Sequence, residues 1–262
     1  LEGKIESSEW KTASIDPAPE RDSIQHALFL DGGGGLNQSV AARLAHLGVT
    51  VHEFPVGVIG EKFVAPREGK INLVVLGSDV DLTSARRVLK SLESQNKSKR
   101  ASIVVTGKMP SDDRRKSLRE LGAEWALWTP FDDADLRFVV RSAMPTDYAS
   151  RERNAARIPT NAMAWIRARA RREVGVLSSL SRRGAFVEMT EPLPEGSSIK
   201  LEFELPAGRI STFAKVVHQR MTSGVNPDIS TSGIDVTFYG LDPAGEFTIG
   251  EIVDANAERF KP

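Results

Sequence analysis

Two arginines and a serine–glycine motif in the second half of the sequence have a spacing suited to anion binding. Arg153 and Arg157 are four positions apart, and Ser179, Ser181 and Gly184 follow as a Ser-x-Ser-x-x-Gly motif. A guanidinium group binds phosphate oxygens through two parallel hydrogen bonds, and a serine hydroxyl can donate or accept one more. The pattern predicts a site for a ligand that carries two negative charges.

The distribution of charge agrees with an anion-binding surface in this part of the chain. The whole sequence holds 35 Lys and Arg against 35 Asp and Glu, but residues 145–183 hold nine arginines against three acidic residues. Such a local excess indicates an anion site or a solvated face. Arg167, Arg169 and Arg171 alternate along an expected strand with Trp165 as their one aromatic neighbour. Nucleic-acid binding normally interleaves aromatic platforms, so we favour a solvated face there.

Composition excludes several kinds of chemistry. The chain has no cysteine, which excludes disulfides, thiolate metal sites and cysteine nucleophiles. No histidine pair has the spacing of metal ligands, so we expect no metal site and no cofactor. We find no nucleophile, base and metal set and expect a protein that is not an enzyme. No apolar run approaches the roughly 18 residues of a membrane span, and we expect a cytoplasmic protein.

The first half of the sequence predicts an α/β fold. Apolar strand-like runs at 26–31, 49–56, 71–77, 101–107 and 124–130 alternate with amphipathic, helix-like segments. This alternation is typical of a parallel sheet with helices on both faces. We assign residues 25–144 to this domain and expect residues 1–24, which are polar, to be a flexible segment.

The second half predicts an antiparallel β-barrel. Residues 164–171 and 199–205 alternate between apolar and polar side chains, and further strands are expected at 212–220 and 233–240. Period-two segments separated by Gly- and Pro-containing turns are typical of small barrels. We assign residues 161–262 to the barrel, with a closing helix near 246–260, and residues 145–160 to a linker that carries the arginine pair.

The first domain resembles the receiver domain of response regulators, which has a flavodoxin-like (βα)5 fold. The resemblance rests on VVTG, which contains Thr106, and on LGAEWALWTPFDDADL. Members of that family accept a phosphoryl group on an aspartate, hold Mg²⁺ with acidic residues and contact the phosphate with a lysine. Here Gly77 stands at the acceptor position, Thr129 replaces the lysine, and the acidic pair is reduced to Asp31. The resemblance therefore implies a pseudo-receiver that binds a protein partner rather than a phosphoryl group.

The second domain resembles the PilZ family over about residues 150–255. The arginine pair, the Ser-x-Ser-x-x-Gly motif leading into GAFVEM, and the later GIDVTFYGLD carry this resemblance. Members of the family are small barrels that bind the bacterial second messenger cyclic di-GMP. The resemblance implies that Arg153, Arg157, Ser181 and Gly184 are ligand residues. Ser179 stands where the family has Asp or Asn, and loss of one hydrogen bond there would cost about 1–3 kcal/mol.

Two hypotheses of function follow. In the first, the chain is a cyclic di-GMP effector whose linker arginines clamp the nucleotide and reorient the barrel against the pseudo-receiver. In the second, both domains are degenerate, and the chain is a scaffold that acts through protein contacts alone. A phosphorylated response regulator is a third class, and Gly77 argues against it.

Overall fold

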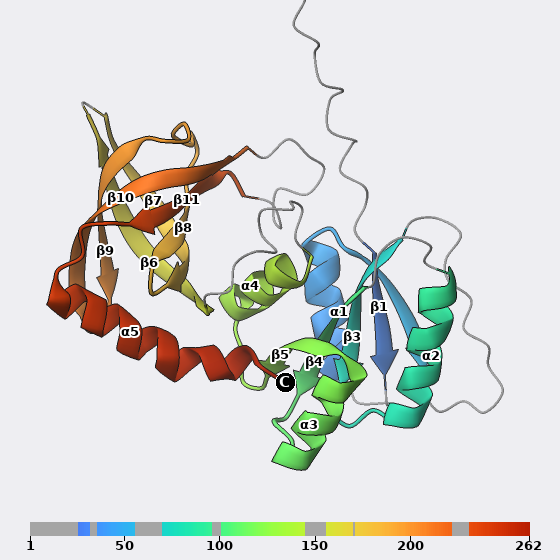
Figure 1. Ribbon diagram of the computed structural model, residues 1–262. Coiled ribbons are helices and arrows are strands. Elements are labelled where there is room, and N and C mark those ends of the chain that lie inside the picture. The colour runs from blue at the N-terminus through green and yellow to red at the C-terminus, as the bar shows by residue number, and fades with distance from the viewer. Residues whose placement is uncertain are drawn as a thin grey trace, which may run out of the picture.

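The computed structural model describes residues 26–31, 36–55, 70–95, 101–144, 156–169, 171–221 and 231–262. These residues form an α/β unit and a β-barrel that lie side by side (Figure 1). The expected N-terminal segment at 1–24 and most of the expected linker lie outside the described residues.

The α/β unit contains a five-stranded parallel sheet, as the sequence predicted. The strand order is β2-β1-β3-β4-β5, and every neighbouring pair runs parallel. Its described elements are β1 (His26–Asp31), α1 (Leu36–His46), β2 (Thr50–Pro55), β3 (Ile71–Gly77), α2 (Leu82–Gln95), β4 (Ser102–Gly107), α3 (Asp112–Leu121), β5 (Ala123–Trp128) and α4 (Asp133–Ala143). The doubly wound, receiver-like fold is therefore confirmed.

Two apolar cores lie on opposite faces of this sheet. One core joins the sheet to α2 and α3 through buried residues such as Val88 and Leu118. The other joins it to α1 and α4 through residues such as Leu44 and Val139. Helix α4 begins with a capping box, in which the Asp132 carboxylate accepts a hydrogen bond from the backbone N–H three residues later. This cap fixes the start of the helix that faces the barrel.

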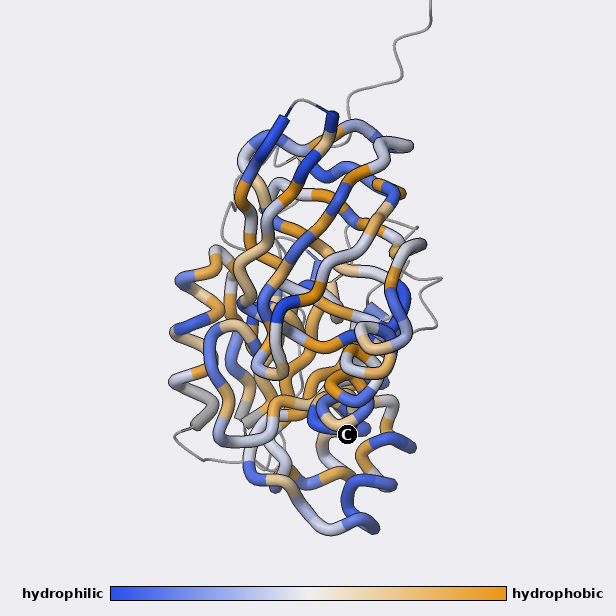
Figure 2. The backbone as a smooth tube through the Cα atoms, turned by 90° about the vertical axis from the view of Figure 1, so that its left-hand side faces the viewer, coloured by the Kyte–Doolittle hydropathy of each residue, from blue (hydrophilic) through white to orange (hydrophobic). Residues whose placement is uncertain are grey.

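The second unit is a closed, six-stranded antiparallel barrel with strand order β10-β11-β8-β7-β6-β9. Its described elements are β6 (Arg157–Ala168), β7 (Arg171–Ser181), β8 (Gly184–Glu188), β9 (Ser198–Leu205), β10 (Gly208–Arg220), β11 (Gly233–Phe238), α5 (Pro243–Ala257) and the short 3-10 helix η2 (Glu258–Phe260). Apolar and polar residues alternate along the strands (Figure 2). The predicted barrel and its closing helix are confirmed.

The barrel differs in two details from the sequence-based boundaries. The strand expected at 164–171 is interrupted, because Arg169 adopts a left-handed conformation (φ 52°) in a tight turn between Ala168 and its ladder partner Arg171. Arg157 was placed in the linker, but it is the first residue of β6, where it pairs with Ser181. Ladder pairing with β7 thus extends the strand back toward the arginine pair.

The C-terminal segment connects the barrel to the α/β unit. Helix α5 closes the barrel with Ile249 and Val253, which lie in its core. The segment then reaches the α/β unit, as Figure 1 shows. There the buried Phe260 ring packs edge-on against Phe138 of α4, with 5.3 Å between ring centroids. Arg259 Nη2 lies 2.8 Å from the Asp135 carboxylate of the same helix. The two units are therefore joined by an apolar contact and an ion pair.

We predict that Phe260→Ala weakens the docking of the two units. Truncating a buried phenylalanine costs about 3–5 kcal/mol, since apolar contacts are lost and a cavity is left. Urea unfolding should show this loss, and small-angle scattering should show a larger radius of gyration. Phe247→Ala is the matched control, because Phe247 lies on the preceding helix α5 and is 70% exposed. Equal behaviour of the two variants would contradict the assigned role of Phe260.

A second prediction concerns the pH dependence of Asp135. Burial raises the pKa of its carboxyl above the ordinary value, although Arg259 acts in the opposite direction. The carboxyl of Asp135 therefore binds a proton more tightly in the folded chain than in the unfolded chain. The stability that this protonated carboxyl contributes is fully present below about pH 4 and is lost as the pH rises through the raised pKa. In urea titrations at several pH values, Asp135→Asn should gain stability relative to the unsubstituted chain across that window. A relative loss of stability as the pH rises would contradict this assignment.

Candidate functional site

A row of side chains crosses four neighbouring strands on the outer face of the barrel. Pro159 of β6 pairs with Ser179 of β7, Ser179 pairs with Phe186 of β8, and Phe186 pairs with Asp235 of β11. Residues directly opposite each other in antiparallel strands point to the same face of the sheet. The neighbour Val236 belongs to the barrel core, so the row faces outward.

Asp235 is the ionisable residue of this row, and it is buried. Its side chain is only 2% exposed. Arg157 Nη1 lies 3.6 Å from one carboxylate oxygen, and Arg220 Nη2 lies 3.3 Å from the other. A buried carboxylate is costly unless cations and hydrogen bonds compensate it. Asp235 therefore holds two guanidinium groups, from β6 and from the end of β10, on one patch of the barrel.

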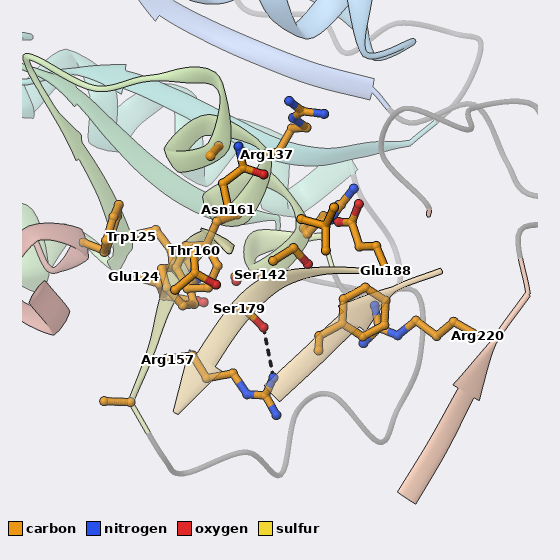
Figure 3. A pocket seen from close by; sticks show the side chains of 18 of the residues that line it. Glu124, Trp125, Arg137, Ser142, Arg157, Thr160, Asn161, Ser179, Glu188 and Arg220 are labelled. Carbon is orange, nitrogen blue, oxygen red and sulfur yellow. Dashed lines mark hydrogen bonds and ion pairs between the residues drawn. The ribbon is translucent and has the colours of Figure 1, made fainter. Parts of the chain in front are cut away.

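The structure brings together Arg157 and Ser179, two of the residues that the resemblance assigns to the ligand site. Arg157 Nη1 donates a hydrogen bond to Ser179 Oγ over 3.1 Å (Figure 3). Arg220 lies over the Phe186 ring, with 4.8 Å between the guanidinium carbon and the ring centroid. This cation–π contact and the hydroxyl hold both cationic groups in defined positions. The patch can bind an anion without ordering flexible side chains first.

The patch opens into a cavity of about 360 Å³ between the barrel and the α/β unit. Such a volume is at the lower end of the range for small-molecule sites. The lining residues from β5 and α4 are Glu124, Trp125, Ala134, Arg137, Phe138, Arg141 and Ser142, and those from the barrel side and the C-terminal segment are Ala156, Arg157, Thr160, Asn161, Val176, Ser178, Ser179, Phe186, Glu188, Arg220, Phe260 and Lys261. Both units thus form its walls (Figure 3).

Two of the expected ligand residues have structural roles in the barrel. The Ser181 hydroxyl donates to the Gly184 carbonyl over 2.9 Å and so closes the hairpin between β7 and β8. A Cβ atom on Gly184 would lie 2.1 Å from the Val236 carbonyl oxygen, so β11 packs too closely for any other residue. Neither Ser181 nor Gly184 lines the cavity, and Arg153 lies outside the described residues.

The residues that the resemblance assigns to degenerate receiver positions lie at or next to the carboxyl ends of strands of the α/β unit. Gly77 ends β3 and lies beside Thr106 of β4 in the ladder. Thr129 donates both its backbone N–H and its hydroxyl to the Gly107 carbonyl. Asp31 ends β1, and its side chain is not among those described.

The part of the chain that the structure describes contains no group of three or more His, Asp or Glu side chains arranged as metal ligands. Among the described helices, none is long and apolar enough to cross a membrane.

Sequence reasoning missed several residues of the arginine patch and of the cavity beside it. The sequence does contain one sign that Asp235 is unusual, because it is an acidic residue between the apolar residues of GIDVTF. Arg220 ends the strand-like run VVHQR, but nothing in that run indicates that it pairs with Asp235, fifteen positions later. Arg141 and Glu188 form an ion pair between α4 and β8. Such a contact between domains leaves no sequence pattern to recognise.

Comparison with protein families identifies the barrel. Residues 151–255 match the model of the PilZ domain. Residues 151–255 are therefore a PilZ domain, and a receiver-like unit precedes them. A search of curated proteins found no match.

Solved structures resemble each half separately. The PilZ domain of Escherichia coli YcgR with c-di-GMP is 18% identical and matches 41% of this chain and 92% of its own, with a TM-score of 0.33. Bacillus subtilis MotI/DgrA is 15% identical, with a TM-score of 0.34, and the match spans 39% of this chain but only half of its own. Vibrio cholerae CheY4, a chemotaxis protein, is 16% identical over 46% of this chain and 99% of its own, with a TM-score of 0.35. At these identities and TM-scores, the matches carry no inference about ligands or partners.

We predict that Gly184→Ala destabilises the barrel even without any ligand. The added methyl group would overlap a backbone carbonyl, and overpacking of this kind costs about 1–3 kcal/mol. Thermal unfolding of the ligand-free chain measures the loss. Ser211→Ala, at an exposed position of β10, should leave the unfolding midpoint unchanged. A Gly184→Ala chain as stable as this control would show that β11 does not require the glycine.

Proposed function

We propose that this chain is a cyclic di-GMP effector that binds the nucleotide in the cavity beside Arg157. The supporting observation is the guanidinium of Arg157, held by Ser179 and Asp235 on the cavity face of a PilZ domain. Cyclic di-GMP has two phosphates and two guanines. The guanidinium fork suits both the phosphate oxygens and the O6 and N7 edge of guanine.

The contacts in the site support an exchange in which Arg157 leaves the Ser179 hydroxyl and binds the ligand. A hydrogen bond between a guanidinium and a phosphate has charge on both sides, and it is stronger than one to a serine hydroxyl. An incoming phosphate can therefore take Arg157 from Ser179. Arg220 adds a second described guanidinium to the same patch. In this proposal Arg153 supplies a further guanidinium from the segment that precedes β6, while Ser181 and Gly184 shape the hairpin beneath the ligand.

Ser179 occupies the place of an Asp or Asn in the family, and its contact indicates how the site works without one. The hydroxyl accepts from Arg157, so it positions the guanidinium. Asp235 supplies the carboxylate that the motif lacks, because it holds the same Arg157 from β11. We propose that this arrangement compensates part of the affinity that the serine loses.

The receiver-like unit has a different role in the proposal. A phosphoryl-transfer site needs a carboxylate nucleophile and metal ligands placed together. Gly77 provides no nucleophile, and Asp79, two residues later, is exposed. We propose that this unit takes no phosphoryl group and that it contacts a protein partner.

One observation favours the alternative, a scaffold without nucleotide. Carboxylates already compensate three cationic side chains of the cavity, since Asp235 lies between Arg157 and Arg220, and Glu188 pairs with Arg141. A ligand must compete with these internal partners. Binding measurements therefore decide between the two functions.

Titration calorimetry of the full chain with cyclic di-GMP should show binding, and Arg157→Ala should weaken it. Loss of charge-assisted hydrogen bonds worth about 1.5–3 kcal/mol corresponds to roughly ten- to a hundredfold. Arg157→Lys should also bind weakly, because an ammonium group keeps the charge but loses the fork. Arg172→Ala is the control, since Arg172 is an exposed arginine of the adjacent strand β7.

Two results would count against the proposed effector. Absence of both binding heat and a thermal shift in the unsubstituted chain would favour the scaffold. Binding that is equally strong in Arg157→Ala and Arg172→Ala would place the ligand elsewhere.

A further inference from the structure

The cavity is not a property of the PilZ domain alone, because helix α4 of the receiver-like unit forms part of its wall. Arg137, Phe138 and Arg141 are its main contributions. Of these, Arg141 approaches the barrel most directly, since it pairs with Glu188 of β8. The two side chains are 18% and 23% exposed. An ion pair this sheltered is screened less by salt than a surface pair.

Glu188 lies on the same face of the barrel as the arginine patch. It is two residues from Phe186 along β8, and alternate residues of a strand point to the same side. Its carboxylate therefore faces the cavity to which Arg157 and Ser179 contribute. Glu188 places a negative charge on the wall of the cavity that holds the proposed phosphate site, and it engages a guanidinium from the other unit.

We propose that Arg141 is a ligand-binding residue contributed by the receiver-like unit, and that Glu188 occupies its guanidinium until an anionic nucleotide takes it. This inference rests on the proposed function. The phosphate and the carboxylate compete for the same donor groups of Arg141. Ligand binding replaces a contact between the two units with a bridge through the nucleotide, from α4 to the barrel.

The bridge assigns a purpose to the receiver-like unit that does not involve phosphorylation. The unit contributes affinity for the ligand, and by linkage the ligand changes the free energy of docking between the units. The apolar contact of Phe260 with Phe138 does not involve Glu188 and keeps α4 next to the barrel when the ion pair opens. Nucleotide binding then changes the orientation of α4 relative to the barrel.

The proposal makes opposite predictions for the two members of one ion pair. Arg141→Ala removes a ligand donor and should weaken cyclic di-GMP binding about tenfold. Glu188→Gln removes the competitor and a negative charge from the cavity, and it should strengthen binding about three- to tenfold. In the double variant the gain from Glu188→Gln should disappear, because the guanidinium that it releases is absent. If the pair only fastened the two units together, both substitutions would change affinity in the same direction.

Titration calorimetry on the full chain measures these changes in affinity for cyclic di-GMP. Thermal unfolding checks that each variant is folded. Arg141→Lys supplies a second variant that keeps the positive charge and loses the fork, and it should also bind more weakly. Arg86→Ala is the matched control, because Arg86 is an exposed arginine on α2 of the same unit, away from the cavity.

The outcomes separate this inference from the proposed function. If Arg157→Ala loses binding while Arg141→Ala and Glu188→Gln both behave like Arg86→Ala, the bridge is wrong and the effector stands. If Arg141→Ala and Glu188→Gln both weaken binding, the pair is a structural fastening, and the inference is overturned. If the unsubstituted chain does not bind cyclic di-GMP, the proposed function fails, and this inference fails with it.

Discussion

The site depends on one buried carboxylate on the outer face of a closed barrel. Asp235 belongs to β11, and its side chain is almost fully withdrawn from water. An ionised group in that position must be compensated, and Arg157 and Arg220 do so from two other strands. The same requirement fixes both guanidinium groups on one patch, where a serine hydroxyl and an aromatic ring hold them further. The requirement to compensate the buried carboxylate of Asp235 thus produces a preorganised cationic surface.

The position of the second unit turns this surface into a cavity. The C-terminal segment leaves the barrel through α5 and packs Phe260 into the apolar core that also contains Phe138. Helix α4 is thereby placed opposite the barrel patch, and its Arg141 meets Glu188. The unit supplies a wall and charged groups, which require folding but no phosphoryl chemistry.

Most of the fold could be predicted from the sequence, and only part of the site could. Periodicity distinguished the parallel sheet from the barrel, since the helix and strand repeats differ and each repeat extends over many residues. The ladder between β6 and β7 brings Arg157 to Ser179, and the resemblance had assigned both residues to one ligand site without predicting this contact. The hydrogen bond from Ser181 to Gly184 is local to the hairpin. The Ser-x-Ser-x-x-Gly motif gave no sign of the packing at Gly184, because its close neighbour Val236 lies on β11, more than fifty residues later. Arg141 and Glu188 meet only when the domains dock, and no local pattern encodes that meeting.

The central claim is that the barrel patch around Arg157 binds the cyclic dinucleotide. A crystal structure of the full chain grown with cyclic di-GMP tests it most directly. The expected result is a phosphate or guanine edge within hydrogen-bonding distance, about 3 Å, of the Arg157 guanidinium, in the cavity between barrel and α4. A nucleotide bound on another surface, with the contacts of Arg157 to Ser179 and Asp235 unchanged, would contradict the account.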